Sequence, residues 1–365
     1  MIARPPPVAP PGRRPGRAAI PLPDVFPHRS GVATLKAVEI VDLSGPDTAV
    51  RLVEAPEPDG KPLLASGPGV VVDVHAAGVS FPELLQTRGR YQLKPPLPFV
   101  PGSEVGGVVR EAPPDAALQP GDRVAAFCGL GGWAEVAVAP AWLTFKLPEQ
   151  LDFAQGAALI LNYHTAYFAL CNRGRLQAGE TVLVHGAAGG VGTAALQVAR
   201  GLGARTIAVV SSDAKEAVAR QAGADEVLRS DGPWKDQAVA LSGDRGGVDV
   251  VVDPVGGDRF VDSLRALRPW GRLLVVGFTG GSIPEVKVNR LLLRNIDVVG
   301  AGWGGYILSH PELGPEIGGA LDRLIDEGFV APVVGGRFPP EEASAALRLL
   351  EDREATGKVV LEFRL

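Results

Sequence analysis

A glycine-rich segment, 186–192 (Gly-Ala-Ala-Gly-Gly-Val-Gly), is the part of the chain that points most directly to chemistry. It follows a short aliphatic run, 181–185, and precedes residues 193–200, which have the composition of an amphipathic helix. Small residues at such a turn let the main chain approach a pyrophosphate, which then faces the free N–H groups of the helix. Because a second aliphatic run, 205–210, follows at βαβ spacing, the pattern predicts a dinucleotide-binding site rather than an ordinary turn before a core helix.

The glycines fit the Gly-x-Gly-x-x-Gly frame of such sites at two of its three positions. Gly189 and Gly192 take the second and third positions, and Ala187 takes the first. We expect the phosphates of the cofactor to lie against Gly186, Ala188, Gly189, Gly190, Val191 and Gly192. Redox chemistry is then the leading hypothesis.

The residues after the second run bear on the choice between NADH and NADPH. A domain that binds NAD usually has an acid here to bond the ribose hydroxyls. This chain has Ser211 and Ser212, followed by Lys215, whose hydroxyls and charge suit a 2′-phosphate and favour NADPH. Three alternatives stay open. Ser212 only caps the next helix, Lys215 is a solvated surface residue, or Asp213 reaches the ribose.

The amino-acid composition excludes several classes of protein. The chain has 365 residues, of which 46% are hydrophobic and 21% charged, as in ordinary globular proteins. Its net charge of -5 provides no basic surface for nucleic acid, and it has no run of about 18 apolar residues for a membrane. Two cysteines, Cys128 and Cys171, are too few for a disulfide framework or a four-cysteine zinc site. We therefore expect a cytoplasmic protein, with Cys128, His164 and His185 as packing residues.

The first 33 residues differ from the rest, since they are rich in proline and carry five arginines against one acid. Proline at this density opposes helix formation. We expect residues 1–33 to be a disordered extension, or to precede the true start of the protein.

The order of expected elements divides the remainder. Short strands and turns dominate 34–155, whereas aliphatic strands alternate with helices over 156–305, which predicts a doubly wound parallel sheet. Residues 306–365 add two helices and a final strand, 358–363, which we expect to return to the β-rich part. The predicted fold class is therefore α/β with two domains.

Several short motifs resemble one family. They cover residues 77–81, 88–91, 98–109, 120–124, 162–166, 186–192, 253–257 and 357–361. As a set they resemble the zinc-independent NADPH:quinone oxidoreductase branch of the medium-chain dehydrogenase/reductase family, to which zeta-crystallin belongs. The likeness runs from about Leu35 to Leu365.

The resemblance implies a GroES-like catalytic domain, 34–155, completed by 306–365, and an inserted Rossmann domain, 156–305. The active site would lie in the cleft between them, and two copies would pair through strand 295–300. The zinc branch has a glycine-histidine-glutamate segment that appears here as Gly102-Ser103-Glu104, and serine is a poor zinc ligand. No metal site is therefore expected.

The resemblance also assigns residues. Tyr91, Ser80 and Thr165 are the candidate catalytic residues, while Glu83 is expected to be structural. It adds to the cofactor-binding residues Asn162, Thr165, Val255, Gly277 and Phe278. The alternatives are that Tyr91 packs its own loop and that Thr165 bonds its own helix backbone.

The expected reaction is transfer of a hydride from NADPH to a quinone, for which the protein supplies orientation and a dry cleft. An alternative acceptor is an α,β-unsaturated thioester, ketone or aldehyde. Arg88, Arg90 and Lys94 could bind a coenzyme A thioester, or form a solvated loop. A different alternative is an NADPH-binding structural protein with little turnover. The expected partner is a small molecule, not nucleic acid or membrane.

Overall fold

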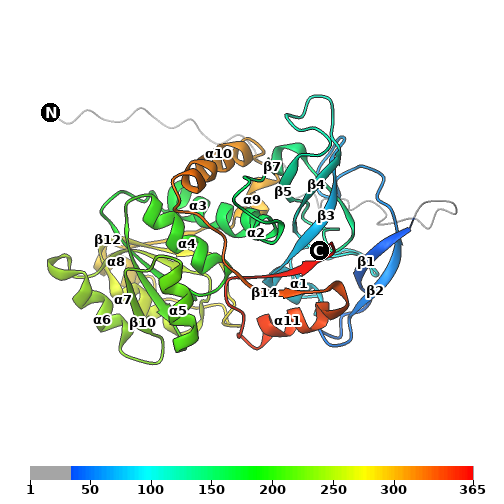
Figure 1. Cartoon of the computed structure of the whole chain (residues 1–365). Helices are drawn as coiled ribbons and strands as arrows, with labels where there is room; N and C mark the ends of the chain where they lie inside the picture. The colour runs from blue at the N-terminus through cyan, green and yellow to red at the C-terminus, as the bar shows by residue number, and fades with distance from the viewer. Residues whose placement is uncertain (1–33, 365) are drawn as a thin grey trace, which may run out of the picture.

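The structure, a computed structural model, describes residues 34–364. The extension predicted over 1–33 lies outside these residues. Figure 1 shows two lobes side by side, one built around the strands β8 to β13 and the other around β1 to β7 with the C-terminal strands. The fold class predicted from the sequence, a GroES-like part with a Rossmann-type part, is confirmed.

The β-rich lobe is mostly antiparallel. Its main sheet has the order β14-β15-β3-β4-β5-β7, with β6 on β3, and β1 pairs separately with β2. The strands are β1 (Thr34–Ile40), β2 (Val50–Pro56), β3 (Val70–Val79), β4 (Glu104–Glu111), β5 (Arg123–Phe127), β6 (Val136–Ala139), β7 (Thr144–Lys146), β14 (Val334–Phe338) and β15 (Lys358–Glu362). The prediction that the last strand returns to this lobe is confirmed, since β15 pairs antiparallel with β3.

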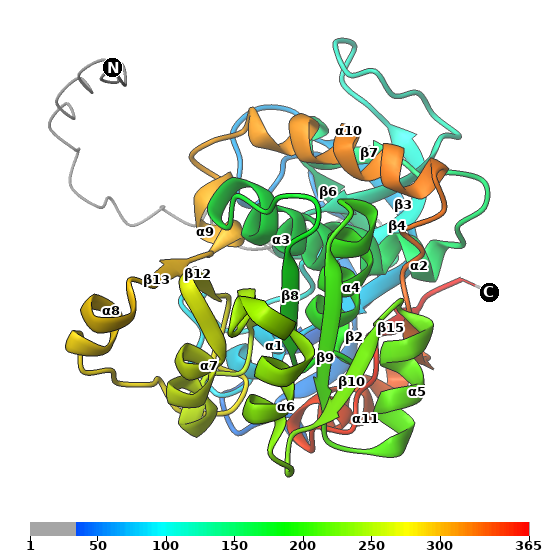
Figure 2. The same cartoon turned by 90° about the vertical axis from the view of Figure 1, so that its left-hand side faces the viewer.

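The second lobe is a parallel sheet of the order β10-β9-β8-β11-β12-β13. Its strands are β8 (Thr181–His185), β9 (Arg205–Val210), β10 (Glu226–Arg229), β11 (Val248–Asp253), β12 (Leu267–Val275) and β13 (Asp297–Gly300). Successive residues of β8 point to opposite faces. Val182 and Val184 pack in one core cluster with α4, and Leu183 packs in another with α7. The sheet is therefore covered on both sides. Figure 2 shows β8, β9 and β10 side by side within it.

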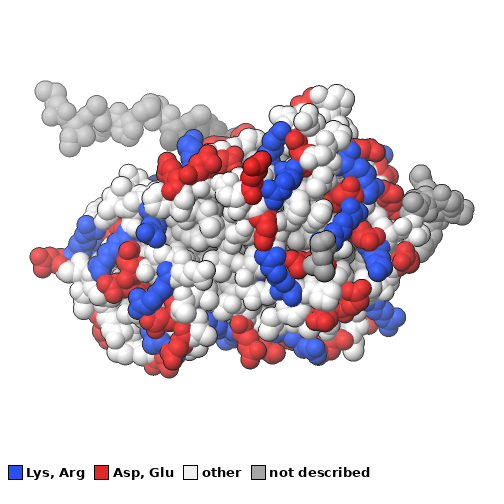
Figure 3. Space-filling model, in the orientation of Figure 1, with Lys and Arg blue, Asp and Glu red and all other residues white. Residues whose placement is uncertain are grey.

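The helices are short. They are α1 (Phe81–Gln86), α2 (Phe153–Leu159), α3 (Thr165–Tyr167), α4 (Gly190–Gly201), α5 (Asp213–Gln221), α6 (Trp234–Leu241), α7 (Phe260–Ala266), α8 (Asn289–Arg294), α9 (Trp303–Ile307), α10 (Leu313–Asp326) and α11 (Ala343–Glu351). Within residues 34–364, none is long and apolar enough to cross a membrane. Lysines, arginines and acids are interspersed on the face shown in Figure 3.

One helical segment joins the lobes. It begins at the cap Asp152, whose carboxylate accepts a hydrogen bond from the main-chain N of Gln155 at 2.7 Å. After α2 the backbone widens into two π-helical stretches, Ile160–His164 and Phe168–Arg173, which the sequence pattern did not distinguish from an α-helix. The first stretch carries Asn162 to the start of α4.

Candidate cofactor and substrate site

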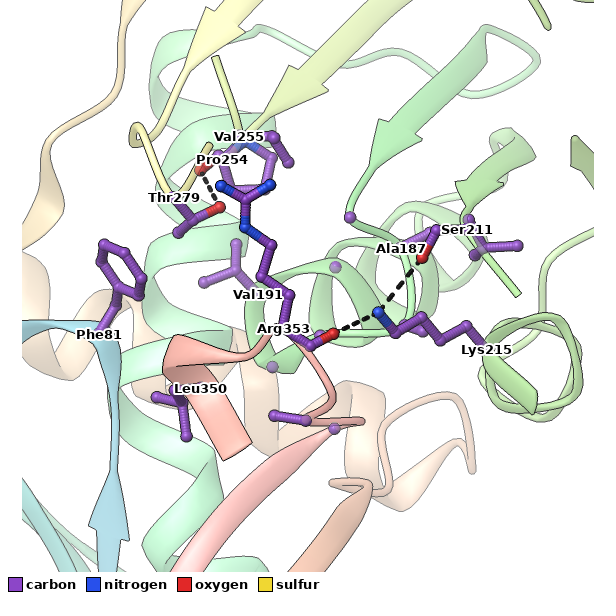
Figure 4. Close-up of a pocket in the computed structure, with 18 of the residues that line it drawn as sticks. Phe81, Ala187, Val191, Ser211, Lys215, Pro254, Val255, Thr279, Leu350 and Arg353 are labelled. Carbon is purple, nitrogen blue, oxygen red and sulfur yellow. Dashed lines mark hydrogen bonds between the residues drawn. The ribbon is translucent and has the colours of Figure 1, made fainter. Parts of the chain in front are cut away.

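A cavity of about 330 Å³ lies where the two lobes meet. Its walls come from the turn after β8, the ends of β9 and β11, the start of α1, and the segment between α11 and β15. Figure 4 shows Phe81 and Leu350 on one side of the cavity and Val255 with Pro254 on another. The site therefore combines the carboxyl ends of parallel strands with residues of the β-rich lobe, where dinucleotides bind in such sheets.

The glycine-rich turn requires its glycines. Gly186 has a φ of +56°, a conformation that L side chains rarely adopt. A Cβ on Gly192 would lie 2.2 Å from the carbonyl oxygen of Gly186. A Cβ on Gly190 would lie 2.5 Å from Nδ2 of Asn162. The turn thus brings bare backbone and the N-terminus of α4 to the cavity, which fits the pyrophosphate of a dinucleotide.

A positive charge lies at the end of β9. Lys215 Nζ donates to Ser211 Oγ at 3.3 Å and to the main-chain oxygen of Arg353 at 2.5 Å, as Figure 4 shows. Burial lowers the pKa of Lys215, because the half-buried ammonium has lost part of its hydration. Lys215 is therefore not the solvated surface residue of the alternative interpretation.

Ser212 and Asp213, which lie between Ser211 and Lys215 on the chain, have other contacts. Ser212 Oγ accepts from the main-chain N of Lys215 at 3.3 Å, so Ser212 caps α5, as one alternative expected. The fully exposed carboxylate of Asp213 accepts from Arg229 Nη1 at 2.5 Å. Neither residue lines the cavity, and the acid that would favour NADH is paired outside it.

A buried polar network lies near the start of α1. Glu83 accepts from Ser103 Oγ at 2.6 Å and from the main-chain N of Ser80 at 2.9 Å. Glu104 accepts from the main-chain N of Leu161 at 2.8 Å and pairs with Lys358. Burial raises the pKa of Glu83, although the hydrogen bond from Ser103 opposes the shift. Glu83 thus has the structural contacts expected of it.

The cavity gathers most of the predicted residues. Those that line it are Ser80, Asn162, Gly186, Ala188, Gly189, Gly190, Val191, Gly192, Ser211, Lys215 and Val255. Thr165 is buried within the interlobe helical segment and does not line it. Tyr91 lies outside the lining as well. Its burial, and then the charge of Glu83, raise the pKa of its phenol, so it stays protonated at neutral pH.

Gly277 and Phe278 do not line the cavity, and β12 ends at Val275, two residues before the end of the predicted strand. Phe278 instead packs over Gly256, where a Cβ would lie 2.8 Å from its ring. Thr279 and Gly280, the next residues, line the cavity in their place.

Several lining residues were missed by sequence reasoning. They are two arginines, Arg259 and Arg353, and two residues at the start of β15, Gly357 and Lys358. The main-chain N of Gly357 donates to the carbonyl oxygen of Ala188 at 2.7 Å, so the C-terminal segment lies directly on the glycine-rich turn. The motif 357–361 indicated that this segment belongs to the family pattern, but it did not indicate which residues the segment contacts.

The side chains near Ser103 do not form a metal site. In the part of the chain that the structure describes, no three or more His, Cys, Asp or Glu side chains are arranged to hold an ion. Ser103 donates its hydroxyl proton to Glu83, and Glu104 is committed to Lys358 and to Leu161 N. This donor set does not fit zinc, which prefers sulfur, imidazole and free carboxylate ligands.

This arrangement, a parallel-sheet nucleotide lobe whose glycine turn faces a GroES-like lobe, defines a class of nicotinamide-dependent oxidoreductases. Residues 67–149 match the family model described as the alcohol dehydrogenase GroES-like domain, and residues 190–316 match the one described as zinc-binding dehydrogenase. The chain belongs to the quinone oxidoreductase branch of the medium-chain dehydrogenase/reductase family.

Similarity to curated proteins and to solved structures supports this family assignment. The chain is 40% identical to quinone oxidoreductase-like protein 2 of Bos taurus over 81% of this chain and 85% of that protein. It is 33% identical to the quinone oxidoreductase of Rattus norvegicus over 91% and 99%. A probable oxidoreductase from Mycobacterium abscessus is 45% identical, with a TM-score of 0.81, over 91% and 100%. The quinone oxidoreductase from Thermus thermophilus, solved also in complex with NADPH, is 37% identical, with a TM-score of 0.75, over 90% and 100%.

Proposed function

We propose that this protein transfers a hydride from NADPH to a quinone without a metal ion. The observation that carries the proposal is the contact of Lys215 with Ser211 and Arg353 at the end of β9, with Asp213 paired outside the cavity. An ammonium and a hydroxyl at this position bind a 2′-phosphate, whereas a diol would leave the charge uncompensated.

The remaining cofactor contacts follow from the lining. The bare turn at Gly189 and Gly190 takes the pyrophosphate, and Asn162 lies beside it for the nicotinamide half. Arg259 adds a second cation, and its Nε is buried with no hydrogen-bond partner among residues 34–364. An unsatisfied buried donor is costly, so a phosphate oxygen there would relieve it. NADPH, when bound, supplies the hydride.

The acceptor would lie between the cofactor and the β-rich lobe. Phe81, Val255 and Leu350 give the cavity apolar walls, which suit a flat ring, and Ser80 offers a hydroxyl for an acceptor oxygen. Transfer to an acceptor that is already electrophilic needs no Lewis acid, in keeping with the contacts of Ser103 and Glu104. Tyr91 and Thr165 lie outside this wall, so Ser80 is the catalytic residue that the geometry favours among the three candidates.

We also infer a homodimer through β13. Among residues 34–364 this strand is at the edge of its sheet and pairs only with β12, which leaves its other side available to a second copy. Val288, Leu292 and Leu293, on or beside the neighbouring α8, are about three-quarters exposed. Large apolar side chains at this density mark an interface. Sedimentation should give a dimer, and Leu292→Glu together with Leu293→Glu should shift it to a monomer.

The function is tested by following nicotinamide absorbance with purified protein across an acceptor panel, with a metal chelator present throughout. The panel holds 1,4-benzoquinone, 9,10-phenanthrenequinone, an enone and crotonyl-coenzyme A. Quinone-dependent loss of NADPH is the expected result. Oxidation by the enone or thioester alone would move the protein to the enoyl reductases, and tight NADPH binding without turnover would favour a structural role.

A further inference from the structure

Lys358 is a buried lysine on the wall of the cavity. The residue is 3% exposed, yet it lines the cavity beside Ser80. Its Nζ donates to Ser80 Oγ at 2.5 Å and to Oε1 of Glu104, with which it forms an ion pair. Burying an ammonium is expensive, so its placement here calls for a reason beyond packing.

The neighbouring backbone leaves just enough room for the ion pair of Lys358 and Glu104. Gly78 on β3 lies opposite Val360 in the ladder with β15. A Cβ at Gly78 would lie 2.7 Å from Cε of Lys358 and 2.8 Å from Cγ of Glu104. The other carboxylate oxygen of Glu104 accepts from Leu161 N. Strands β3, β4 and β15 and the interlobe helical segment therefore hold Lys358 in one position.

This position determines what the hydroxyl of Ser80 can do. An ammonium group has only donors, so Ser80 Oγ must be the acceptor in its bond with Lys358. The proton on Ser80 Oγ is then left to donate, and Ser80 lines the cavity. The positive charge behind the hydroxyl makes it a stronger donor, because it favours negative charge on the oxygen.

We propose that Lys358 is a positioning residue that acts through Ser80 to protonate the acceptor. This inference rests on the proposed function. Hydride transfer reduces the quinone by two electrons, oxidises the cofactor and leaves one quinone oxygen as an anion. The O–H bond of Ser80 breaks as its proton passes to that oxygen, and an N–H bond of Lys358 breaks as its proton passes to Ser80 Oγ. Lys358 regains a proton from water once the hydroquinone has left.

The first test compares turnover in three variants. Lys358→Met alone would leave Glu104 buried without its partner, so the main variant combines Lys358→Met with Glu104→Gln, which keeps an acceptor for Leu161 N. Ser80→Ala removes the hydroxyl and keeps the ion pair. Lys146→Met, at a mostly exposed lysine on β7 that pairs with Asp122, is the matched control. We expect kcat with 1,4-benzoquinone to fall about 100-fold in the double variant and in Ser80→Ala, the size of a lost acid–base group.

NADPH affinity should stay within threefold in both variants, because Lys358 acts on the acceptor. The proposal would be overturned if the folded double variant kept kcat within threefold of the unaltered protein, or if its whole loss lay in NADPH binding. Circular dichroism and thermal unfolding establish that each variant is folded.

The second test needs no turnover. The probe is 4-nitrophenol, a stand-in for the reduced acceptor, whose phenolate absorbs visible light. Bound to the unaltered protein with NADP⁺ at a pH near the phenol's own pKa, it should be more ionised than in free solution. The double variant should lose that excess and Lys146→Met should keep it. Equal ionisation in the double variant and the unaltered protein, or no excess in the unaltered protein, would refute the role of Lys358. A lack of quinone turnover by the unaltered protein would instead refute the proposed function.

Discussion

Lys215 Nζ donates to the main-chain oxygen of Arg353 at 2.5 Å, which joins the nucleotide lobe to the C-terminal segment across the mouth of the cavity. Arg353 in turn donates from Nη2 to the carbonyl oxygen of Gly280, beyond the end of β12. The two cations thus border the same end of the site from different lobes. A cofactor phosphate bound there would compensate the charges of Lys215 and Arg353, and it would also touch the contact between the two lobes.

Removing the charge of Lys215 should weaken NADPH binding specifically. A hydrogen bond to a charged group is worth about 1.5–3 kcal/mol, so Lys215→Met should raise the Kd of NADPH roughly 10- to 100-fold. The Kd of NADH should change less than threefold. Titration of nicotinamide fluorescence measures both. Lys235→Met, on α6 and paired with Asp236, is the control. Equal weakening for the two cofactors would contradict the assignment of the 2′-phosphate site.

Arg353 should increase the affinity for NADPH, while its backbone conformation lowers the stability of the folded protein. Its φ is +60°, a region that costs an L residue about 1–2 kcal/mol and costs glycine little. Arg353→Gly and Arg353→Ala should therefore weaken NADPH binding to the same extent, while the glycine variant is more stable to urea by about 1 kcal/mol. Because both variants lose the same side-chain contacts, their difference isolates the backbone. Equal stabilities would show that the loop relaxes when the side chain is removed.

Gly192→Ala should abolish the binding of both cofactors. The new methyl group would meet backbone atoms of Gly186 and Ala187 at 2.2 and 2.7 Å, so the turn must open. Gly319→Ala is the control, since Gly319 is exposed in α10 with nothing within 4 Å of a new Cβ. That change should add about 0.5–1 kcal/mol of stability through helix propensity. Retained NADPH binding in Gly192→Ala would show that the turn does not hold the pyrophosphate.

The sequence predicts the glycine-rich turn better than it predicts the residues that surround the turn in the cavity. The glycine turn, Ser211 and Lys215 were predictable because they lie within one βαβ unit, where local spacing fixes the geometry. Gly277 and Phe278 were predicted at the site but are not in the lining, since the ring of Phe278 packs against Gly256, a contact that the local pattern does not encode. Arg353 and Lys358 lie more than 130 residues beyond Lys215 on the chain. Contacts between distant parts of the chain hold them at the cavity, among them the pairing of β15 with β3 and the hydrogen bond from Gly357 N to the carbonyl oxygen of Ala188, and no local pattern encodes these contacts.

A buried histidine should make stability sensitive to acid. His185 Nε2 lies 2.8 Å from Ser263 Oγ, which itself donates to the main-chain oxygen of Arg259, so the histidine is the donor. Burial, and then the charge of Arg259, lower its pKa from 6.5 to about 3. Between these values the unfolded chain binds the additional proton. Stability should therefore fall as pH drops from 6.5 toward 3, by up to about 1.4 kcal/mol per pH unit for this group.

His185→Gln tests this, because the glutamine amide can still donate to Ser263 and does not titrate. Urea unfolding across this pH range should show a shallower loss of stability than in the unaltered protein. His310→Gln, the same substitution at a partly buried histidine that stacks on Tyr306, is the matched control. An identical slope in His185→Gln would mean that other groups cause the acid sensitivity.

The most direct measurement is kcat/KM for NADPH and for NADH in one assay with the unaltered protein and saturating 1,4-benzoquinone. The contacts of Lys215, Ser211 and Arg353 predict rapid quinone-dependent oxidation of NADPH. They also predict that kcat/KM for NADPH exceeds that for NADH by about tenfold or more, the ratio that one charged phosphate contact supplies. Equal values for the two cofactors would contradict the assignment of the cofactor, and the absence of quinone-dependent oxidation would contradict the assignment of the acceptor.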